Sequence, residues 1–177
     1  MQRRSFLKLS AASLASSAVM AQDLPSTSAT FVSAGSDRFM RPRDMGITTN
    51  RFKVSGKDTK NGLFSLEQTF HQKGGPPRHL HPFQDEWFYA IEGEFKFEIG
   101  KDTFSLKPGD SILAPRNIPH VWAFTGGAVG RILVTFAPAG KMEAFFDQIA
   151  DSHSMPPQTP ELWSNFDMQL LGPPLKI

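Results

Sequence analysis

The sequence RHLHPFQDEW, residues 78–87, places two histidines and two carboxylates within ten positions. His79 and His81 are separated by one residue, so both project from the same face if this segment is extended. Two neighbouring imidazoles on one face can reach a single cation. Glu86 follows a turn and begins the next predicted strand, so its carboxylate can return to that face. Asp85 then points to the opposite face, which favours a solvated side chain.

A second proline-rich turn supplies a third histidine. Pro115 and Pro119 bracket this turn, and His120 follows directly at the start of an aromatic strand. Three of the five histidines of the chain therefore lie in two short segments. His71 and His153 lie outside both segments, and we expect them at the surface.

Each of these residues also has an ordinary explanation. A histidine near prolines is commonly a surface residue or a hydrogen-bonded core residue. Glu86 has an alternative partner in Arg78. The two segments predict a metal site only when they are taken together with the surrounding sequence.

The surrounding sequence is typical of an all-β domain. From about residue 47 to residue 136, short runs alternate apolar and polar residues and end at Gly, Pro or Asp. The run 94–99 alternates strictly, turns at 100–102 and returns as 103–106, which predicts a hairpin. We expect further strands at 64–70, 86–91, 111–113, 120–124 and 131–136. Many short strands at this spacing predict a sandwich or a barrel.

The first histidine segment resembles the first sequence motif of the cupin family, G-x5-H-x-H-x3,4-E-x6-G. The match runs from His79 and His81 through Glu86 to Gly93. The leading glycine falls at position 74 or 75, one or two residues closer to the histidine than in the pattern.

The second segment resembles the second cupin motif, G-x5-P-x-G-x2-H-x3-N. Gly109, Pro115 and His120 match it. Asn117 replaces the usual glycine, a mild departure because asparagine tolerates the positive φ angle that glycine often provides. Phe124 replaces the usual asparagine and brings an apolar side chain to the strand face of His120.

The resemblance covers residues 60–137 and implies both a fold and a ligand set. The implied fold is all-β, a cupin double-stranded β-helix (jelly-roll barrel) over residues 46–140 with a short C-terminal helix. The implied ligands of one divalent transition metal are His79, His81, Glu86 and His120. Three neutral imidazoles and one carboxylate suit iron, manganese, nickel, cobalt, copper or zinc better than calcium or magnesium, which prefer oxygen ligands.

Residues 1–21 resemble a twin-arginine signal peptide. Arg3 and Arg4 precede a short, serine-rich apolar run and a cleavage site before Gln22. The run is shorter than the roughly 18–20 apolar residues of a membrane-spanning helix. We therefore expect export by the twin-arginine machinery, a periplasmic location and no membrane contact after cleavage. A retained anchor is the alternative.

The charge and the cysteine content exclude some functions. The chain has 19 basic and 17 acidic residues, and the first 21 residues hold three of the basic ones and no acidic one. The remaining chain is nearly neutral, which removes the main support for a nucleic-acid partner. The chain has no cysteine, so thiolate metal sites and thiol nucleophiles are excluded.

Two segments flank the predicted barrel. Residues 22–45 have little periodicity and predict an N-terminal arm, which could serve a homodimer. Residues 141–177 predict a C-terminal helix and a proline-rich tail. Four apolar residues stand at helical spacing in the helix: Met142, Phe145, Phe146 and Ile149.

Six aromatic residues are candidates to line a substrate pocket, although aromatic residues at strand spacing more often belong to the core alone. They are Phe70, Phe88, Phe97, Trp122, Phe124 and Phe136.

The single barrel and the run FAPAG at 136–140 resemble the quercetin-dioxygenase-like cupins. This resemblance implies a metal-dependent dioxygenase, similar to quercetin 2,3-dioxygenase, that acts on a flavonol-like or other small aromatic or enolic substrate. Glu86 would then also serve as a general base. Two alternatives stay open: a non-oxidative isomerase, lyase or decarboxylase, and a non-catalytic periplasmic protein that binds a metal or a small ligand.

Overall fold

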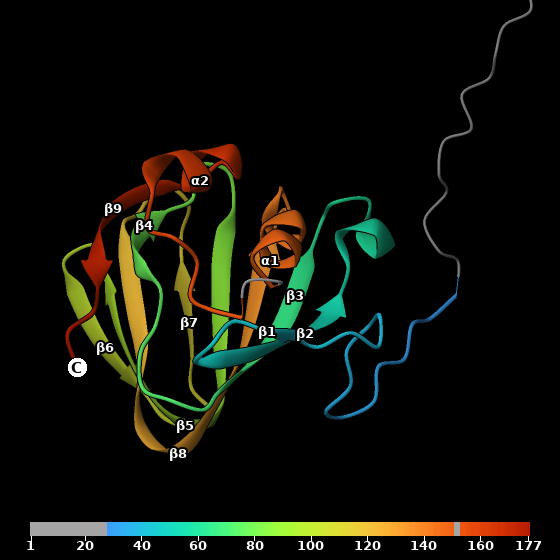
Figure 1. Cartoon of the computed structure of the whole chain (residues 1–177), viewed down its shortest axis with the longest axis horizontal. Helices are drawn as coiled ribbons and strands as arrows, with labels where there is room; N and C mark the ends of the chain where they lie inside the picture. The colour runs from blue at the N-terminus through green and yellow to red at the C-terminus, as the bar shows by residue number, and fades with distance from the viewer. Residues whose placement is uncertain (1–27, 151–152) are drawn as a thin grey trace, which may run out of the picture.

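The computed structural model describes residues 28–150 and 153–177 (Figure 1). The predicted signal peptide and the first part of the predicted arm lie outside these residues. Within the described residues, no helix combines the length and the apolar character needed to cross a membrane.

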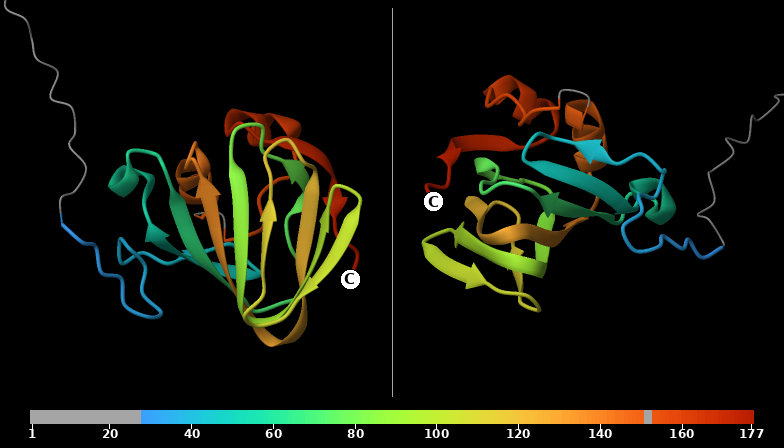
Figure 2. Two further views of the ribbon diagram at one scale, coloured as in Figure 1. Left: turned by 180° about the vertical axis from the view of Figure 1, so that it is seen from behind. Right: turned by 60° about the horizontal axis from the view of Figure 1, so that its bottom comes forward.

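The described chain folds into one antiparallel sheet of nine strands that wraps around a common interior (Figures 1 and 2). Strand order runs β1-β2-β3-β8-β4-β9, and β5 joins β8 to β6 and β7. This arrangement confirms the predicted all-β jelly-roll barrel. The strands are β1 (Arg43–Asp44), β2 (Thr48–Val54), β3 (Phe64–Phe70), β4 (Pro77–Leu80), β5 (Asp85–Ile99), β6 (Asp102–Leu106), β7 (Ser111–Ala114), β8 (His120–Ala137) and β9 (Gln169–Pro174).

Two of these strands are longer than the sequence pattern predicted. β5 combines the expected strands 86–91 and 94–99, and β8 combines 120–124 and 131–136. Their pairing shifts register between Ala90 and Phe95, where β5 bends at Gly93. A bulge of this kind turns a strand sharply without ending it. Each strand can therefore contribute to both sides of the barrel.

The helices cover one end of the barrel (Figure 1). α1 (Met142–Ala150) follows β8 and buries the apolar stripe predicted from its spacing, which confirms the C-terminal helix. α2 (Pro160–Asn165) buries Trp163. A short 3-10 helix, η1 (Gly56–Thr59), connects β2 to β3.

The two flanking segments are more structured than the sequence suggested. In the tail, β9 pairs with β4, a strand that the proline-rich sequence did not predict. In the arm, β1 pairs with β2. The buried Arg43 guanidinium lies 2.9 Å from Asp37 and 2.6 Å from Asp147 of α1. The described part of the arm is therefore attached to the barrel and to α1.

The bend at Gly93 generates a stability prediction. Gly93 has φ +79°, and a Cβ there would lie 2.8 Å from the Phe124 ring and 2.9 Å from the Val129 carbonyl oxygen. Gly109 also has a positive φ, +96°, but a Cβ there would meet nothing within 4 Å. We expect Gly93→Ala to lower the free energy of unfolding by about 3 kcal/mol, because backbone strain and overpacking add. Gly109→Ala should cost about 1 kcal/mol, because only the strain remains. Urea denaturation monitored by circular dichroism measures both, and equal losses would contradict the bend at Gly93.

Candidate metal centre

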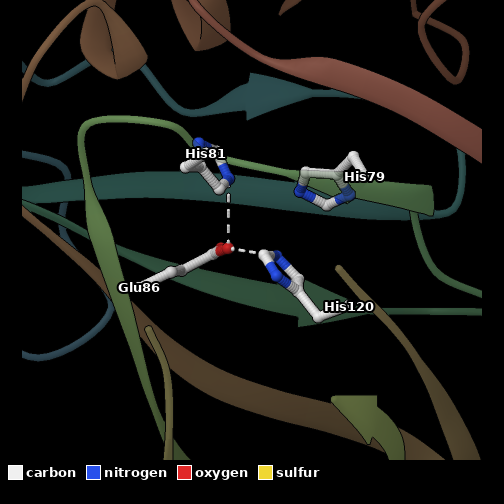
Figure 3. Close-up of side chains that lie close together, drawn as sticks. All are labelled: His79, His81, Glu86 and His120. Carbon is white, nitrogen blue, oxygen red and sulfur yellow. Dashed lines mark hydrogen bonds and ion pairs between the residues drawn. The ribbon is translucent and has the colours of Figure 1, made fainter. Parts of the chain in front are cut away.

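The four predicted ligands meet at one point inside the barrel (Figure 3). His79 comes from β4, His81 follows that strand, Glu86 lies near the start of β5, and His120 begins β8. All four residues are buried, with at most 4% of each exposed. One ligating atom from each residue lies within 4.8 Å of those from the other three.

Strand pairing and one turn explain this convergence. His79 and His120 are direct partners between β4 and β8. The loop before His120 is fastened to the first motif, because the Asn117 amide donates to the His81 carbonyl oxygen at 2.8 Å. Asn117 has φ +63°, so it adopts the positive-φ geometry expected at the motif's glycine position.

Backbone carbonyls hold two of the imidazoles in one orientation. Nδ1 of His79 lies 2.7 Å from the Pro77 carbonyl oxygen, and Nδ1 of His120 lies 3.1 Å from that of Ile118. A carbonyl oxygen only accepts, so each Nδ1 carries a proton and donates it. Nε2 of each ring is then left for a cation, which is the usual arrangement of metal-binding histidines.

The protonation states also suit a cation. Burial lowers the pKa of His79 well below its ordinary value, and the neighbouring His120 and His81 lower it further, so the ring is neutral near pH 7. Burial by itself would raise the pKa of Glu86. The adjacent His120 and His81 rings outweigh that effect and hold the pKa of Glu86 well below its usual range. The carboxylate is therefore ionised.

Both nitrogens of the His120 ring lie close to oxygen atoms that accept hydrogen bonds. Its Nδ1 faces the Ile118 carbonyl, and its Nε2 lies 2.9 Å from Oε2 of Glu86, so both nitrogens face acceptors. The same carboxylate oxygen lies 3.2 Å from Nε2 of His81, which makes no hydrogen bond with the described residues. A divalent cation between these atoms would satisfy all of them and balance the buried carboxylate. The residues present therefore fit a transition metal.

The neighbouring charged residues lie outside the cluster. Asp85 faces outward and forms an ion pair with Arg116 at 2.7 Å. The hydrogen bond from this guanidinium lowers the pKa of Asp85 to about 2. Arg78 donates a hydrogen bond to Glu98 and not to Glu86, the alternative partner considered from the sequence. The Glu86 carboxylate lies beside His81 and His120 instead.

The two remaining histidines lie away from the site. His71 is exposed and lies 2.9 Å from the Thr49 hydroxyl. His153 is exposed near Asp44.

A cavity of about 50 Å³ adjoins the ligands. Of the six aromatic residues predicted to line a pocket, Phe70, Trp122 and Phe136 line this cavity. Phe88, Phe97 and Phe124 are buried in the barrel core instead.

Much of the cavity wall comes from segments that the sequence did not connect with the site. The arm and β2 supply Met45 and Thr48, and β3 supplies Gln68. The C-terminal region supplies the rest of this set: Met142, Phe145, Phe146, Met155, Pro156, Trp163 and Met168. The helical stripe of α1 was visible in the sequence, but its spacing did not show which part of the barrel it covers.

Residues 66–136 match the family model described as "Cupin domain", and both ligand segments fall within this range. This finding and the fold support membership of the cupin superfamily.

Two curated relatives and one solved structure are similar to this chain. Protein SchB of Streptomyces halstedii is 27% identical over 60 residues, which are 34% of this chain and 44% of that protein. Polyketide synthase CurC of Streptomyces cyaneus is 25% identical over 60 residues, which are 34% of this chain and 39% of that protein. The chain therefore spans less than half the length of either relative. The structure of KdgF from Halomonas sp. superposes with a TM-score of 0.53 at 19% identity, over 63% of this chain and 94% of that one, and it supports the fold alone.

The ligand set generates a prediction on metal content. We expect His120→Ala to lose most of the bound metal, because it removes one of four donors and leaves Glu86 with a single histidine partner. His71→Ala, the matched control outside the cluster, should retain the wild-type content. Elemental analysis of the purified proteins measures the stoichiometry, and circular dichroism checks that the barrel is folded. Unchanged metal in folded His120→Ala would show that the ligand assignment is wrong.

Proposed function

We propose that this protein is a metal-dependent cupin enzyme that reacts a small enolic or aromatic substrate with dioxygen. The observation that carries the proposal is that three of the four donors, His79, His81 and Glu86, line a mostly apolar cavity. A bound transition metal would supply Lewis acidity toward a substrate oxygen and redox chemistry toward dioxygen. The apolar wall excludes water and favours an uncharged or delocalised substrate over a highly charged one.

The size of the cavity restricts the substrate. Pockets for drug-sized ligands are roughly 300–1,000 Å³, and a cavity of about 150 Å³ is known to hold benzene. The cavity beside Glu86 has only about 50 Å³. A small enolic compound therefore suits this cavity better than a three-ring flavonol.

Glu86 suits the role of ligand better than that of base. An effective general base near pH 7 needs a pKa close to that pH. The adjacent histidine rings hold the pKa of Glu86 far below it, and a cation would lower it further. The base role stays a prediction, and it requires the carboxylate to leave the cation during turnover.

Export by the twin-arginine machinery to the periplasm is part of the proposal. It rests on Arg3, Arg4 and the following apolar run. That route carries folded proteins, so the metal would be acquired in the cytoplasm before transport.

The test is oxygen uptake after anaerobic loading with iron(II), manganese, nickel or cobalt. We expect at least one metal to support consumption with a small enolic compound, about tenfold or more above the metal-free protein and above His120→Ala. The panel includes small enolisable ketones and one flavonol, and the flavonol should be the poorer substrate. Turnover without oxygen would favour the isomerase, lyase or decarboxylase alternative. Metal retention with no turnover of any compound would favour a binding protein.

A further inference from the structure

Apart from the predicted metal ligands, the residues that line the cavity have two buried polar atoms with no hydrogen-bond partner among the described residues. They are Nε1 of Trp122 and Oγ1 of Thr48. Each residue is only 3% exposed, and both line the cavity that contains His79, His81 and Glu86. Burying an unpaired donor is unfavourable, so such groups indicate a missing partner.

The Trp122 ring cannot easily turn to find another partner. It stacks on Phe97 at 5.6 Å between centroids with an interplanar angle of 14°. The rings of Phe88 and Phe70 pack against it in T-shaped arrangements, with their centroids 5.4 and 5.5 Å from that of Trp122. Three packed rings therefore fix the direction of the indole N–H before any ligand arrives.

A second tryptophan in the same cavity provides an internal comparison. Trp163 also lines the cavity, but its Nε1 donates to the Pro157 carbonyl oxygen at 3.1 Å. The local fold therefore satisfies the N–H of Trp163 and leaves that of Trp122 unsatisfied. This contrast indicates a specific role for the Trp122 donor.

The two residues that carry the unpaired atoms are linked through Phe70. Thr48 is the cross-strand partner of Phe70, and the Phe70 ring contacts Trp122. Trp122 stands two residues after His120 on β8, so both side chains point to the same face, roughly 7 Å apart along the strand. A small ligand that touches the metal ligands at one end can therefore reach Trp122 at the other, in the cavity that Thr48 also lines.

We propose that Trp122 Nε1 and Thr48 Oγ1 form a polar subsite that binds a second oxygen of the substrate, away from the metal-bound one. The indole N–H donates to this oxygen, and the threonine hydroxyl donates to it or accepts from it. The inference rests on the proposed function only in placing the first substrate oxygen at the metal. The ligand class is a small, otherwise apolar molecule with two oxygen functions a few bonds apart.

The experiment compares 4-hydroxybutan-2-one with butan-2-one, which share the carbonyl and differ by one hydroxyl. Both are titrated into zinc-loaded protein, because zinc is diamagnetic and does not consume the probe. The indole ¹H–¹⁵N signals report on each tryptophan, and loss of one signal in Trp122→Phe assigns it. We expect the hydroxyketone to shift the Trp122 signal and to leave those of Trp163 and Trp87 nearly unchanged.

Variants then test the two groups separately. Trp122→Phe keeps an aromatic ring without the N–H, and Thr48→Val keeps the shape without the hydroxyl. Each should weaken binding of the hydroxyketone about tenfold and leave the weak binding of butan-2-one and the zinc content unchanged. Thr48→Ser, which retains the hydroxyl, should restore the affinity. Trp87→Phe makes the same change outside the cavity and should have no effect.

The outcomes separate this subsite from the proposed function. If the hydroxyketone leaves the Trp122 signal in place, or binds Trp122→Phe as tightly as wild type, the subsite is wrong even where oxygen uptake is observed. If the signal shifts and the variants weaken binding while no metal supports oxygen uptake, the polar subsite is supported and the proposed dioxygenase function is wrong. Should Thr48→Val fail to fold, Trp122→Phe alone decides.

Discussion

The site depends on burying one ionised carboxylate among three imidazoles. Glu86 is 4% exposed, and within the described part of the chain no Lys or Arg side chain forms an ion pair with it. An unpaired charge in such an environment is strongly unfavourable, and the guanidinium groups of Arg116 and Arg78 are paired with Asp85 and Glu98 instead. The arrangement of β4, β5 and β8 therefore places the charge where a cation can balance it.

The remaining architecture protects that arrangement. β4 contributes His79 and is flanked by β8 on one side and β9 on the other. The ring of Trp163 from α2 lies 5.1 Å from that of His79, so the helical cover contacts a ligand directly. Arg43 fastens the arm to α1 through Asp147. Segments far apart in the sequence thus close one small apolar space over the donors.

The sequence predicted the shared face of His79, His81 and Glu86 because their geometry is local, whereas the resemblance to the cupin motifs was needed to add His120. Strand parity places His79 and His81 on one face, excludes Asp85, and needs no knowledge of the distant chain. The tolerance of Asn117 for a positive φ was equally local, and the structure confirms it. The comparisons support the cupin superfamily, whereas the oxidative chemistry, the substrate and the export stay proposals.

The alternation of side chains along a strand predicts which face a residue occupies, but not its position along the axis of the barrel. Phe88 has the same parity as Glu86 and points inward, yet it belongs to the packed core, whereas Phe136 lines the cavity. Glycines occur both at bends within a strand and at turns between strands. The sequence therefore predicted two strands each for β5 and β8. The sequence did not predict β9, because prolines disfavour the interior of a strand. Here Pro174 is tolerated because it lies opposite Pro77, the first residue of β4.

X-ray absorption spectroscopy of protein that acquired its metal in the cell tests the central claim most directly. The account predicts three imidazole nitrogens and one carboxylate oxygen at about 2.0–2.2 Å, with any further ligands being light atoms. A sulfur ligand from one of the cavity methionines, or fewer than three imidazoles around the metal, would contradict it.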